Sequence, residues 1–331
     1  MSRRDFAVLL TGVGKRYDIV TAFSQHARTI AADPSPLAPA RYAADLAVVP
    51  PRVDDPAYVP FLAELCAEHD VRAVVPLTDL DLEVLARSEL PAFVAPGDVA
   101  RATYDKFATH ELLLELGLPS PPTCLPEDEP ESYPVMVKPR QGSGARSIHP
   151  AADRAQKDFF VDYVDEPVMV QKLMDGPEFS IDILCDLDGR CLNAIPRTMI
   201  ESRGGESIKG SVIADAELVE LGRAVSEAMG FRGPATVQAF RDRDIGLGIT
   251  DVNTRFGGAF PAPMYAAREG HTYPELIVRM AAGETIEPHV GDFRSGFTFT
   301  RYYWQLELDE NLRATPRDIV PDGARPPRID P

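Results

Sequence analysis

Short blocks of apolar residues alternate with mixed stretches along the first hundred residues of the chain. Consecutive apolar residues predict buried strands, and apolar positions three to four residues apart predict helices. The pattern predicts strands at 6–12, 46–50, 72–79 and 92–96, and helices at 18–28, 59–68 and 81–87. Strands and helices that alternate at this spacing indicate a parallel, doubly wound α/β domain, unless the region serves only as a packing module.

The rest of the chain is dominated by strands. A separate helix is predicted at 103–116, capped by Thr103 and stopped by Gly117, and the prolines that follow at 119, 121 and 122 indicate a stiff link between domains. The pattern beyond predicts strands at 123–125, 134–139, 146–150, 168–174, 233–242, 246–256 and 297–308, a hairpin over 178–200 that turns at Asp188-Gly189, and helices at 152–163, 214–229 and 274–282.

The net charge of the chain limits the classes of partner that it could bind. The 331 residues include 51 acidic and 34 basic side chains, a formal net charge of −17, which repels nucleic acids and anionic membranes. A small anionic ligand stays open, because local basic residues can overcome the mean field. No apolar run is long enough to span a membrane, and residues 1–18 are typical of a first strand rather than a signal peptide. The 4 cysteines include no CxxC pair, which argues against a disulfide framework or structural zinc and fits a reducing cytoplasm.

Several familiar motifs are absent. The segment TGVGKR at 11–16 is no Walker A loop, because Leu9 and Arg16 stand where that loop needs Gly and Ser or Thr. Neither a GxSxG elbow nor an HExxH pair occurs.

Two lysines and a glycine loop form the first candidate site. Lys138 ends a predicted strand, and Gly142, Ser143 and Gly144 follow it in VKPRQGSGARSI. Glycines let backbone N–H groups converge on an anion, and a lysine supplies a point charge for a phosphate oxygen. Lys106, near the start of the predicted 103–116 helix, is a second cation. Taken alone, these are also what a hairpin and a solvated lysine look like.

A possible nucleoside cradle follows at 168–182. The strand, the turn at Asp175-Gly176 and the next strand place the backbone of 171–173 where it could face an adenine edge. Glu178 could accept hydrogen bonds from ribose hydroxyls.

The strongest polar signal lies in ITDVNTRF, residues 249–256. Strand alternation puts Asp251, Asn253 and Arg255 on one face, and Gln238 faces the same way on the preceding strand. Oxygen ligands of this kind suit Mg²⁺, which takes few protein carboxylates and leaves the rest of its shell to phosphates and water. The alternative is a solvent-exposed polar face.

Taken in this order, the features resemble the ATP-grasp superfamily. The nearest branch is that of the carbamoyl-phosphate synthetase large subunit, which includes the pyrrolysine-pathway lysine ligase and related amino-acid ligases. The resemblance rests on PLTDLDLEVLA, YDKFATHELLLELGLPSP, VMVKPRQGSGARSI, VQKLMDGPEFSID and VQAF followed by DVNTRFGGAFP. It implies an α/β chain with a Rossmann-like pre-ATP-grasp domain (1–102), a linker helix with the small ATP-grasp subdomain (103–165), the large subdomain with the metal and substrate site (166–310) and a tail (311–331).

The resemblance also implies roles for individual residues. Lys106 and Lys138 would hold ATP phosphates, beneath a flexible lid formed by Gly142, Ser143 and Gly144. Gln171, Lys172 and Leu173 would line adenine, and Glu178 would bind ribose. Gln238, Asp251 and Asn253 would hold one or two Mg²⁺ ions, for which Mn²⁺ could substitute, although the family usually has Glu where this chain has Asp251. Arg255 would neutralise the transferred phosphoryl group, and Arg203 would pair with a substrate carboxylate.

The expected activity is that of an ATP-dependent carboxylate–amine ligase. Such an enzyme phosphorylates a carboxylate and then joins it to an amine, releasing ADP and phosphate. The expected partners are an amino acid or short peptide with an amine or ammonia, in a cytoplasmic protein that could form a homodimer. The alternatives are phosphorylation of carbamate or bicarbonate, as in carbamoyl-phosphate synthesis, and a nucleotide-binding sensor without turnover.

Overall fold

The computed structural model describes residues 4–142, 144, 146–203, 206–258, 265–302 and 305–314. Ser143 of the glycine loop therefore lies outside the described residues, as does most of the 311–331 tail. No helix among the described residues is long and apolar enough to cross a membrane.

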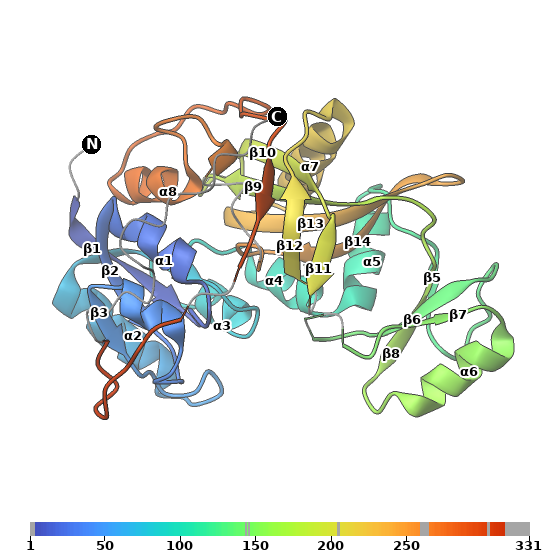
Figure 1. The fold of residues 1–331 in the computed structure, drawn as a ribbon, viewed down its shortest axis with the longest axis horizontal. Coiled ribbons are helices and arrows are strands. Elements are labelled where there is room, and N and C mark those ends of the chain that lie inside the picture. Colours follow the sequence, from blue (N-terminus) through green and yellow to red (C-terminus); the bar gives the residue numbers. More distant parts are fainter. Residues whose placement is uncertain are drawn as a thin grey trace, which may run out of the picture.

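The N-terminal domain is built around a parallel sheet, as the alternating pattern predicts (Figure 1). Its elements are β1 (Arg4–Thr11), α1 (Tyr17–Ser24), β2 (Ala27–Ala32), a 3₁₀ helix (Pro39–Ala43), β3 (Leu46–Val48), α2 (Tyr58–His69), β4 (Val71–Pro76), α3 (Leu82–Ala86) and α4 (Gly97–Tyr104). The strand order is β3-β2-β1-β4, and every neighbouring pair is parallel. The carboxyl ends of these strands therefore share one edge, which is where such sheets place their functional loops.

Two predictions for this domain were wrong. The helix predicted at 18–28 ends at Ser24, and β2 begins at Ala27, because ARTIAA pairs with β1 and is buried there despite the helical preference of alanine. The strand predicted at 92–96 forms only a bridge between Val74 and Ala92.

Asp81 lies buried beyond the end of β4 and accepts a hydrogen bond from the Tyr58 hydroxyl at 2.7 Å. Burial raises the pKa of Asp81 from 3.8 to about 6, and the hydrogen bonds only partly offset this rise. The folded protein therefore binds more protons than the unfolded chain between about pH 4 and 6. This carboxyl contributes stability at low pH and loses that contribution as the pH rises through this window.

We therefore expect Asp81→Asn to stabilise the protein at neutral pH but not at acidic pH. The gain in the free energy of unfolding should grow from near zero at pH 4 to about 3 kcal/mol above pH 7, as a shift of about two pKa units implies. Urea unfolding of both proteins at several pH values measures this. A difference that does not change with pH would contradict the prediction.

The linker helix begins later than predicted. Its first residue is Lys106 rather than Thr103, because Asp105 caps α5 (Lys106–Glu115) by accepting hydrogen bonds from the N–H groups of Phe107 and Ala108. Thr103 belongs to α4 instead. Asp105 also forms an ion pair with Arg140 at 2.6 Å, and the Lys106 N–H donates to the Arg140 carbonyl. These contacts fix Lys106 beside the start of the glycine loop.

The small subdomain is an antiparallel sheet with one covering helix and its own apolar core (Figure 1). It comprises β5 (Thr123–Cys124), β6 (Val135–Pro139), β7 (His149–Ala151), α6 (Arg154–Tyr163) and β8 (Val168–Lys172), in the sheet order β5-β8-β6-β7. Its core is a cluster of valines and one alanine at 135, 137, 151, 164, 168 and 170. The subdomain is therefore a separate packing unit.

The large subdomain carries the central sheet of the molecule, in the order β10-β9-β13-β14. Its elements are β9 (Glu178–Cys185), β10 (Cys191–Thr198), β11 (Glu201–Arg203), β12 (Glu206–Ser211), α7 (Ala216–Ala228), β13 (Gly233–Asp242), β14 (Gly246–Asn253), α8 (Tyr273–Ala281) and β15 (Thr298–Thr300). A smaller sheet, β11-β12-β15, adjoins it (Figure 1). The late strand predicted at 297–308 is thus much shorter than expected.

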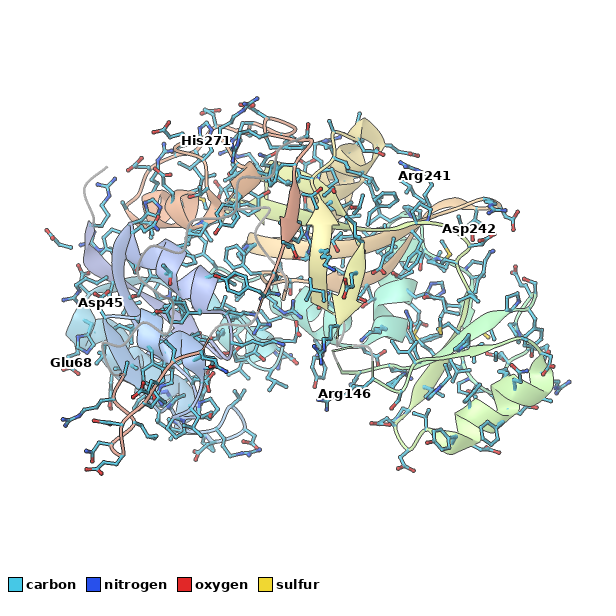
Figure 2. The ribbon with its side chains drawn as sticks, viewed as in Figure 1. Asp45, Glu68, Arg146, Arg241, Asp242 and His271 are labelled. Atoms are coloured by element: carbon cyan, nitrogen blue, oxygen red, sulfur yellow. The ribbon has the colours of Figure 1, made fainter. Side chains whose placement is uncertain are left out.

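The joint between β8 and β9 is tied to the end of β13. Asp242 accepts hydrogen bonds from the Asp175 N–H at 2.8 Å and from the Lys172 ammonium at 3.2 Å. These and other hydrogen bonds hold the pKa of Asp242 well below its usual range. Arg241 and Asp242 lie together at this end of the sheet (Figure 2). A Cβ on Gly176 would stand 1.9 Å from the Arg241 carbonyl oxygen, so only glycine fits at this joint.

The N-terminal domain and the large subdomain share one apolar core. The same cluster contains Phe6 and Phe23 of the first and Leu192, Phe256 and Tyr273 of the second. The rings of Phe23 and Phe256 meet edge to face, with centroids 6.2 Å apart. These two units therefore pack as one body, while the small subdomain has a core of its own.

Candidate active site

A cleft of about 970 Å³ lies where the small subdomain faces the central sheet. Cationic side chains outnumber acidic ones along its walls, by eight (Lys15, Arg16, Lys106, Lys138, Arg146, Lys172, Arg197 and Arg255) to three (Glu166, Glu178 and Asp251). In a chain with a formal net charge of −17, this is a local reversal of sign. The cleft is therefore suited to an anionic ligand.

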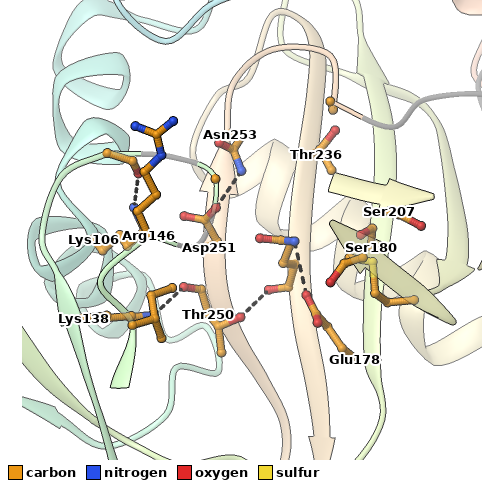
Figure 3. Close-up of a pocket in the computed structure, with 18 of the residues that line it drawn as sticks. Lys106, Lys138, Arg146, Glu178, Ser180, Ser207, Thr236, Thr250, Asp251 and Asn253 are labelled. Carbon is orange, nitrogen blue, oxygen red and sulfur yellow. Dashed lines mark hydrogen bonds between the residues drawn. The ribbon is translucent and has the colours of Figure 1, made fainter. Parts of the chain in front are cut away.

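The two predicted phosphate lysines lie on one side of the cleft together with Arg146 (Figure 3). The Lys106 ammonium donates to the Gly142 carbonyl at 2.8 Å. Gly142 and Gly144 have φ values of 103° and 83°, the left-handed region that the loop needs glycine to adopt. Arg146 is a cation that we did not single out from the sequence, although it directly follows the glycine loop.

Lys138 is buried, with only 7% of its surface exposed. Its ammonium donates to Gln171 Oε1 at 2.8 Å and to the Thr250 carbonyl at 3.2 Å. Burial lowers the pKa of Lys138 to about 8, partly countered by the nearby Asp251 carboxylate. A cation held in this way has lost much of its hydration, so a bound phosphate would stabilise its charge.

The predicted nucleoside residues also line the cleft. The N–H groups of Lys172 and Leu173 already donate to carbonyls of Pro122 and Pro134, so these two donors are engaged within the protein. Glu178 lies beside the predicted metal ligands, because its Oε1 accepts a hydrogen bond from Gln238 Nε2 at 3.2 Å. Burial raises the pKa of Glu178, and Arg197 opposes that rise.

The predicted polar face of β14 is confirmed in its geometry (Figure 3). Asn253 Nδ2 donates to Asp251 Oδ2 at 2.9 Å, and Arg255 Nη2 donates to Asn253 Oδ1 at 2.9 Å. Gln238 is the cross-strand partner of Asp251, and its hydrogen bond to Glu178 turns its carbonyl oxygen away from that residue. One carboxylate and two amides thus lie together, the oxygen ligands that Mg²⁺ accepts.

This set suits a cation that is shared with a ligand. Within the described part of the chain, no group of three or more His, Cys, Asp or Glu side chains could hold a metal ion. Mg²⁺ bound by Asp251 and the two amides would therefore take its remaining ligands from phosphates and water. The cations Lys106 and Lys138 lie beside these ligands, and the Lys138 ammonium reaches the carbonyl of Thr250, the residue before Asp251 (Figure 3).

We call the face formed by Gln238, Asp251 and Asn253 the metal face. Arg255 connects this metal face to the N-terminal domain. Its Nη2 donates to Asp79 Oδ2 at 2.7 Å, and its Nη1 donates to the Phe256 carbonyl at 3.0 Å. The side chain is buried, with 8% exposed. Asp79, in the segment after β4, is a contributor that we missed from the sequence. No local sequence pattern marks it, because its partner Arg255 lies 176 residues further along the chain.

Arg203 does not line the cleft; it lies on β11 as an exposed residue. The neighbouring Ser202 does line it, as do Gly257 and Gly258. Arg197 lies in the wall of the cleft and is almost fully buried. A role for Arg203 in holding a substrate carboxylate remains a prediction.

A row of polar residues crosses the whole central sheet on the side of the cleft. Arg197 on β10 pairs with Ser180 on β9, Ser180 pairs with Gln238 on β13, and Gln238 pairs with Asp251 on β14. Directly paired residues of antiparallel strands point to the same face. The register of four strands therefore sets the floor of the cleft.

The cleft lies between the small subdomain and the central sheet, and comparison with protein families matches segments of the chain that carry its walls. Residues 8–93 match the family model of the PylC-like N-terminal domain, and residues 164–302 match that of the ATP-grasp in the biosynthetic pathway with Ter operon. The chain therefore contains a PylC-like N-terminal domain and an ATP-grasp domain.

Individual relatives agree with this assignment. Carbamoyl-phosphate synthase of Methanobrevibacter smithii is 29% identical over 154 residues, 41% of this chain and 40% of that protein. D-alanine–D-alanine ligase of Corynebacterium efficiens is 27% identical over 229 residues, 59% of this chain and 63% of that protein. The alignments thus span less than two thirds of these curated relatives.

The fold is shared with solved structures. The biotin carboxylase domain of 2-oxoglutarate carboxylase from Hydrogenobacter thermophilus, solved as a dimer with MgADP and bicarbonate, superposes with a TM-score of 0.69. The match covers 89% of this chain and 74% of that one at 18% identity. The likeness establishes the architecture, and the chemistry has to be argued from the residues of this chain.

Proposed function

We propose that the protein is an ATP-dependent carboxylate–amine ligase that acts through an acyl phosphate and releases ADP and phosphate. The observation that carries this proposal is that two chemistries lie side by side in one cleft. The cations Lys106 and Lys138 line the same cleft as Asp251, Asn253 and Arg255, and the Lys138 ammonium contacts the Thr250 carbonyl next to Asp251. This arrangement suits a nucleoside triphosphate whose phosphates bridge lysines on one side and a divalent cation on the other.

Each residue would act by position and charge. Lys106 and Lys138 would hold phosphate oxygens, and Gln238, Asp251 and Asn253 would hold Mg²⁺, which neutralises charge on the phosphates when bound. Arg255, fixed by Asp79 and Asn253, would stabilise the charge on the phosphoryl group in transfer. Its geometry is set before the reaction, so no reorganisation is needed at that step.

Two transfers complete the proposed reaction. A carboxylate oxygen of one substrate attacks the γ-phosphorus of ATP, the bond to the β–γ bridging oxygen breaks, and ADP leaves. An amine nitrogen then attacks the activated carbonyl carbon, phosphate leaves with the bonding electrons, and the nitrogen loses a proton. No side-chain nucleophile is required, which fits the absence of nucleophile motifs in the sequence.

The substrate class proposed is an amino acid or short peptide joined to an amine or ammonia. The D-alanine–D-alanine ligase relative supports an amino-acid substrate, and the carbamoyl-phosphate synthase relative makes carbamate or bicarbonate the alternative. Substitution of Mn²⁺ for Mg²⁺, a homodimer and a cytoplasmic location belong to the same proposal. A sensor without turnover would not need the proposed metal ligands, and this chain carries Gln238, Asp251 and Asn253.

Release of ADP tests the proposal. The purified protein with Mg·ATP is offered pairs of amino acids, and ADP, phosphate and the ligated product are quantified together. We expect ADP and phosphate in equal amounts with one new amide per turnover. AMP and pyrophosphate would contradict the acyl-phosphate route, and bicarbonate-dependent ADP release without amino acids would favour the carbamate alternative. Tight Mg·ATP binding with no turnover on any substrate would favour the sensor.

A further inference from the structure

Arg197 is fixed along one edge by a buried carboxylate. Its Nε donates to Asp182 Oδ2 at 2.7 Å, and the two side chains are 3% and 2% exposed. The other oxygen of Asp182 accepts the Thr236 hydroxyl at 3.1 Å. The Tyr273 hydroxyl donates to the Asp182 carbonyl at 2.9 Å. The guanidinium therefore has a set orientation, with one edge held from behind.

On the other edge of this guanidinium, one N–H group lacks a hydrogen-bond acceptor among the described residues. Arg197 Nη1 is buried and has no hydrogen-bond partner among the residues that the structure describes, although Arg197 belongs to the wall of the cleft. A guanidinium stays charged, and a buried N–H of a cation that lacks an acceptor is destabilising. The protein thus holds a preorganised donor for which none of the described residues supplies an acceptor. An anionic oxygen of a ligand in the cleft would complete it.

Gly257 leaves space beside the layer of side chains formed by Arg197, Asp182 and Thr236. A Cβ on Gly257 would lie 3.0 Å from Thr236 Oγ1 and 3.4 Å from Asp182 Oδ1. Any larger residue at 257 would therefore crowd the layer that fixes Arg197. Ser180, Ser207 and Thr236 lie together on this side of the cleft, away from Lys106 and Lys138 (Figure 3). This end is polar and is separate from the cationic wall proposed for the phosphates.

Distance from the metal face decides what Arg197 could bind. Along the polar row, Arg197 on β10 is three strands away from Asp251 on β14, with Ser180 and Gln238 between them. Three inter-strand spacings amount to roughly 14 Å between the backbones. The carboxylate that is phosphorylated has to lie near Asp251, Asn253 and Arg255. Arg197 is therefore placed for a different anionic group.

We propose that Arg197 is a specificity-determining residue that binds a second carboxylate, one that is not phosphorylated. This inference rests on the proposed ligase function and adds to it that the substrate pair carries a free acid group at the β10 end of the cleft. The group belongs either to the amine-donating substrate, which is then an amino acid rather than ammonia or a simple amine, or to a diacid that is activated at its other end.

Acid and amide probes separate these two sources. In the first arm, glycine or L-alanine is the amine donor, and each is compared with glycinamide or L-alaninamide. In the second arm, L-glutamate or L-aspartate is the activated acid, and each is compared with L-glutamine or L-asparagine. All twenty standard amino acids serve in turn as the other substrate, with saturating Mg·ATP and ADP release as the readout. We expect the charged form to exceed the neutral form about tenfold or more in kcat/KM in one arm.

Variants of the protein test whether Arg197 causes the preference for the charged form of the probe. Arg197→Gln leaves Asp182 buried without its cation and could fail to fold, so the double variant Arg197→Gln with Asp182→Asn removes both charges together. In the folded double variant the preference for the charged form should collapse toward one, mainly through KM, while Mg·ATP affinity stays within about twofold of wild type. Arg190→Gln is the matched control, because Arg190 donates to Asp186 at the same 2.7 Å on the same hairpin but does not line the cleft. It should keep the wild-type preference.

Three results would overturn the inference. One is a folded double variant that keeps the full acid preference, another is a wild-type protein that uses acid and amide equally in both arms, and the third is ADP release with neutral probes but with no charged probe. Failure of wild-type protein to bind Mg·ATP, or to release ADP with any probe, would instead overturn the ligase function from which this inference starts. Circular dichroism and thermal melting establish that each variant is folded.

Discussion

Asp251→Asn is expected to lower the turnover number by about a hundredfold or more while the protein stays folded. Asp251 is the only carboxylate among the three proposed metal ligands, so the substitution removes the one full negative charge that the protein offers to Mg²⁺. Asparagine keeps the size of the side chain and an oxygen that can still accept the hydrogen bond from Asn253 Nδ2. The loss should therefore be electrostatic, and it should be measured as the initial rate of ADP release at saturating Mg·ATP.

Two further variants serve as a control and as a test of whether Arg255 acts at the same step. Asp188→Asn removes an exposed carboxylate in the turn between β9 and β10, away from the cleft, and should leave the rate unchanged. Arg255→Ala should reduce the same step, and the double variant with Asp251→Asn should be little slower than the slower single variant, because both side chains serve one charge cluster. Near wild-type turnover by Asp251→Asn with Mg²⁺ would disprove the metal assignment on β14.

Lys138→Met is expected to weaken Mg·ATP binding by about 1.5–3 kcal/mol, roughly a tenfold to hundredfold rise in Kd. Methionine fills similar space without the charge, so the loss reports the contact with phosphate. The free protein should not lose stability, because Lys138 is 7% exposed and burial already disfavours its charged form. Weaker nucleotide binding with an unchanged or higher melting temperature is the expected pair of results, from calorimetric titration and thermal unfolding.

Lys157→Met is the matched control. Lys157 is also a buried lysine of the small subdomain, 3% exposed, but its ammonium donates to the Pro126 carbonyl and does not line the cleft. Its replacement should leave the Kd for Mg·ATP unchanged. A folded Lys138→Met protein that binds Mg·ATP as tightly as wild type would return Lys138 to a structural role.

Features that depend on local periodicity could be predicted from the sequence. Alternation along β14 placed Asp251 and Asn253 on one face, and their hydrogen bond confirms it. The turn at Asp188-Gly189 follows from local residue preference, and Gly189 has the positive φ that such a turn needs. The order of the motifs was enough to identify the superfamily.

Features that depend on contacts between distant segments could not. The burial of Lys138 follows from the approach of Gln171 and Thr250, which belong to other strands. The start of α5 is set by Asp105, whose partner Arg140 lies beyond the linker in sequence. The buried pair of Arg197 with Asp182 and the ion pair of Asp79 with Arg255 are further cases. Neither pair has a local signature.

The shared core of the N-terminal domain and the large subdomain limits how this chain could be recombined with its relatives. Phe23 packs on Phe256, and Asp79 holds Arg255, so the first domain completes both the interior and the reactive face of the other unit. A chimera that exchanged the N-terminal domain alone would have to match a steric surface and a charge at once. The small subdomain has a valine core of its own, so its exchange would have to preserve polar contacts such as those of Lys138 with Thr250 and Lys172 with Asp242.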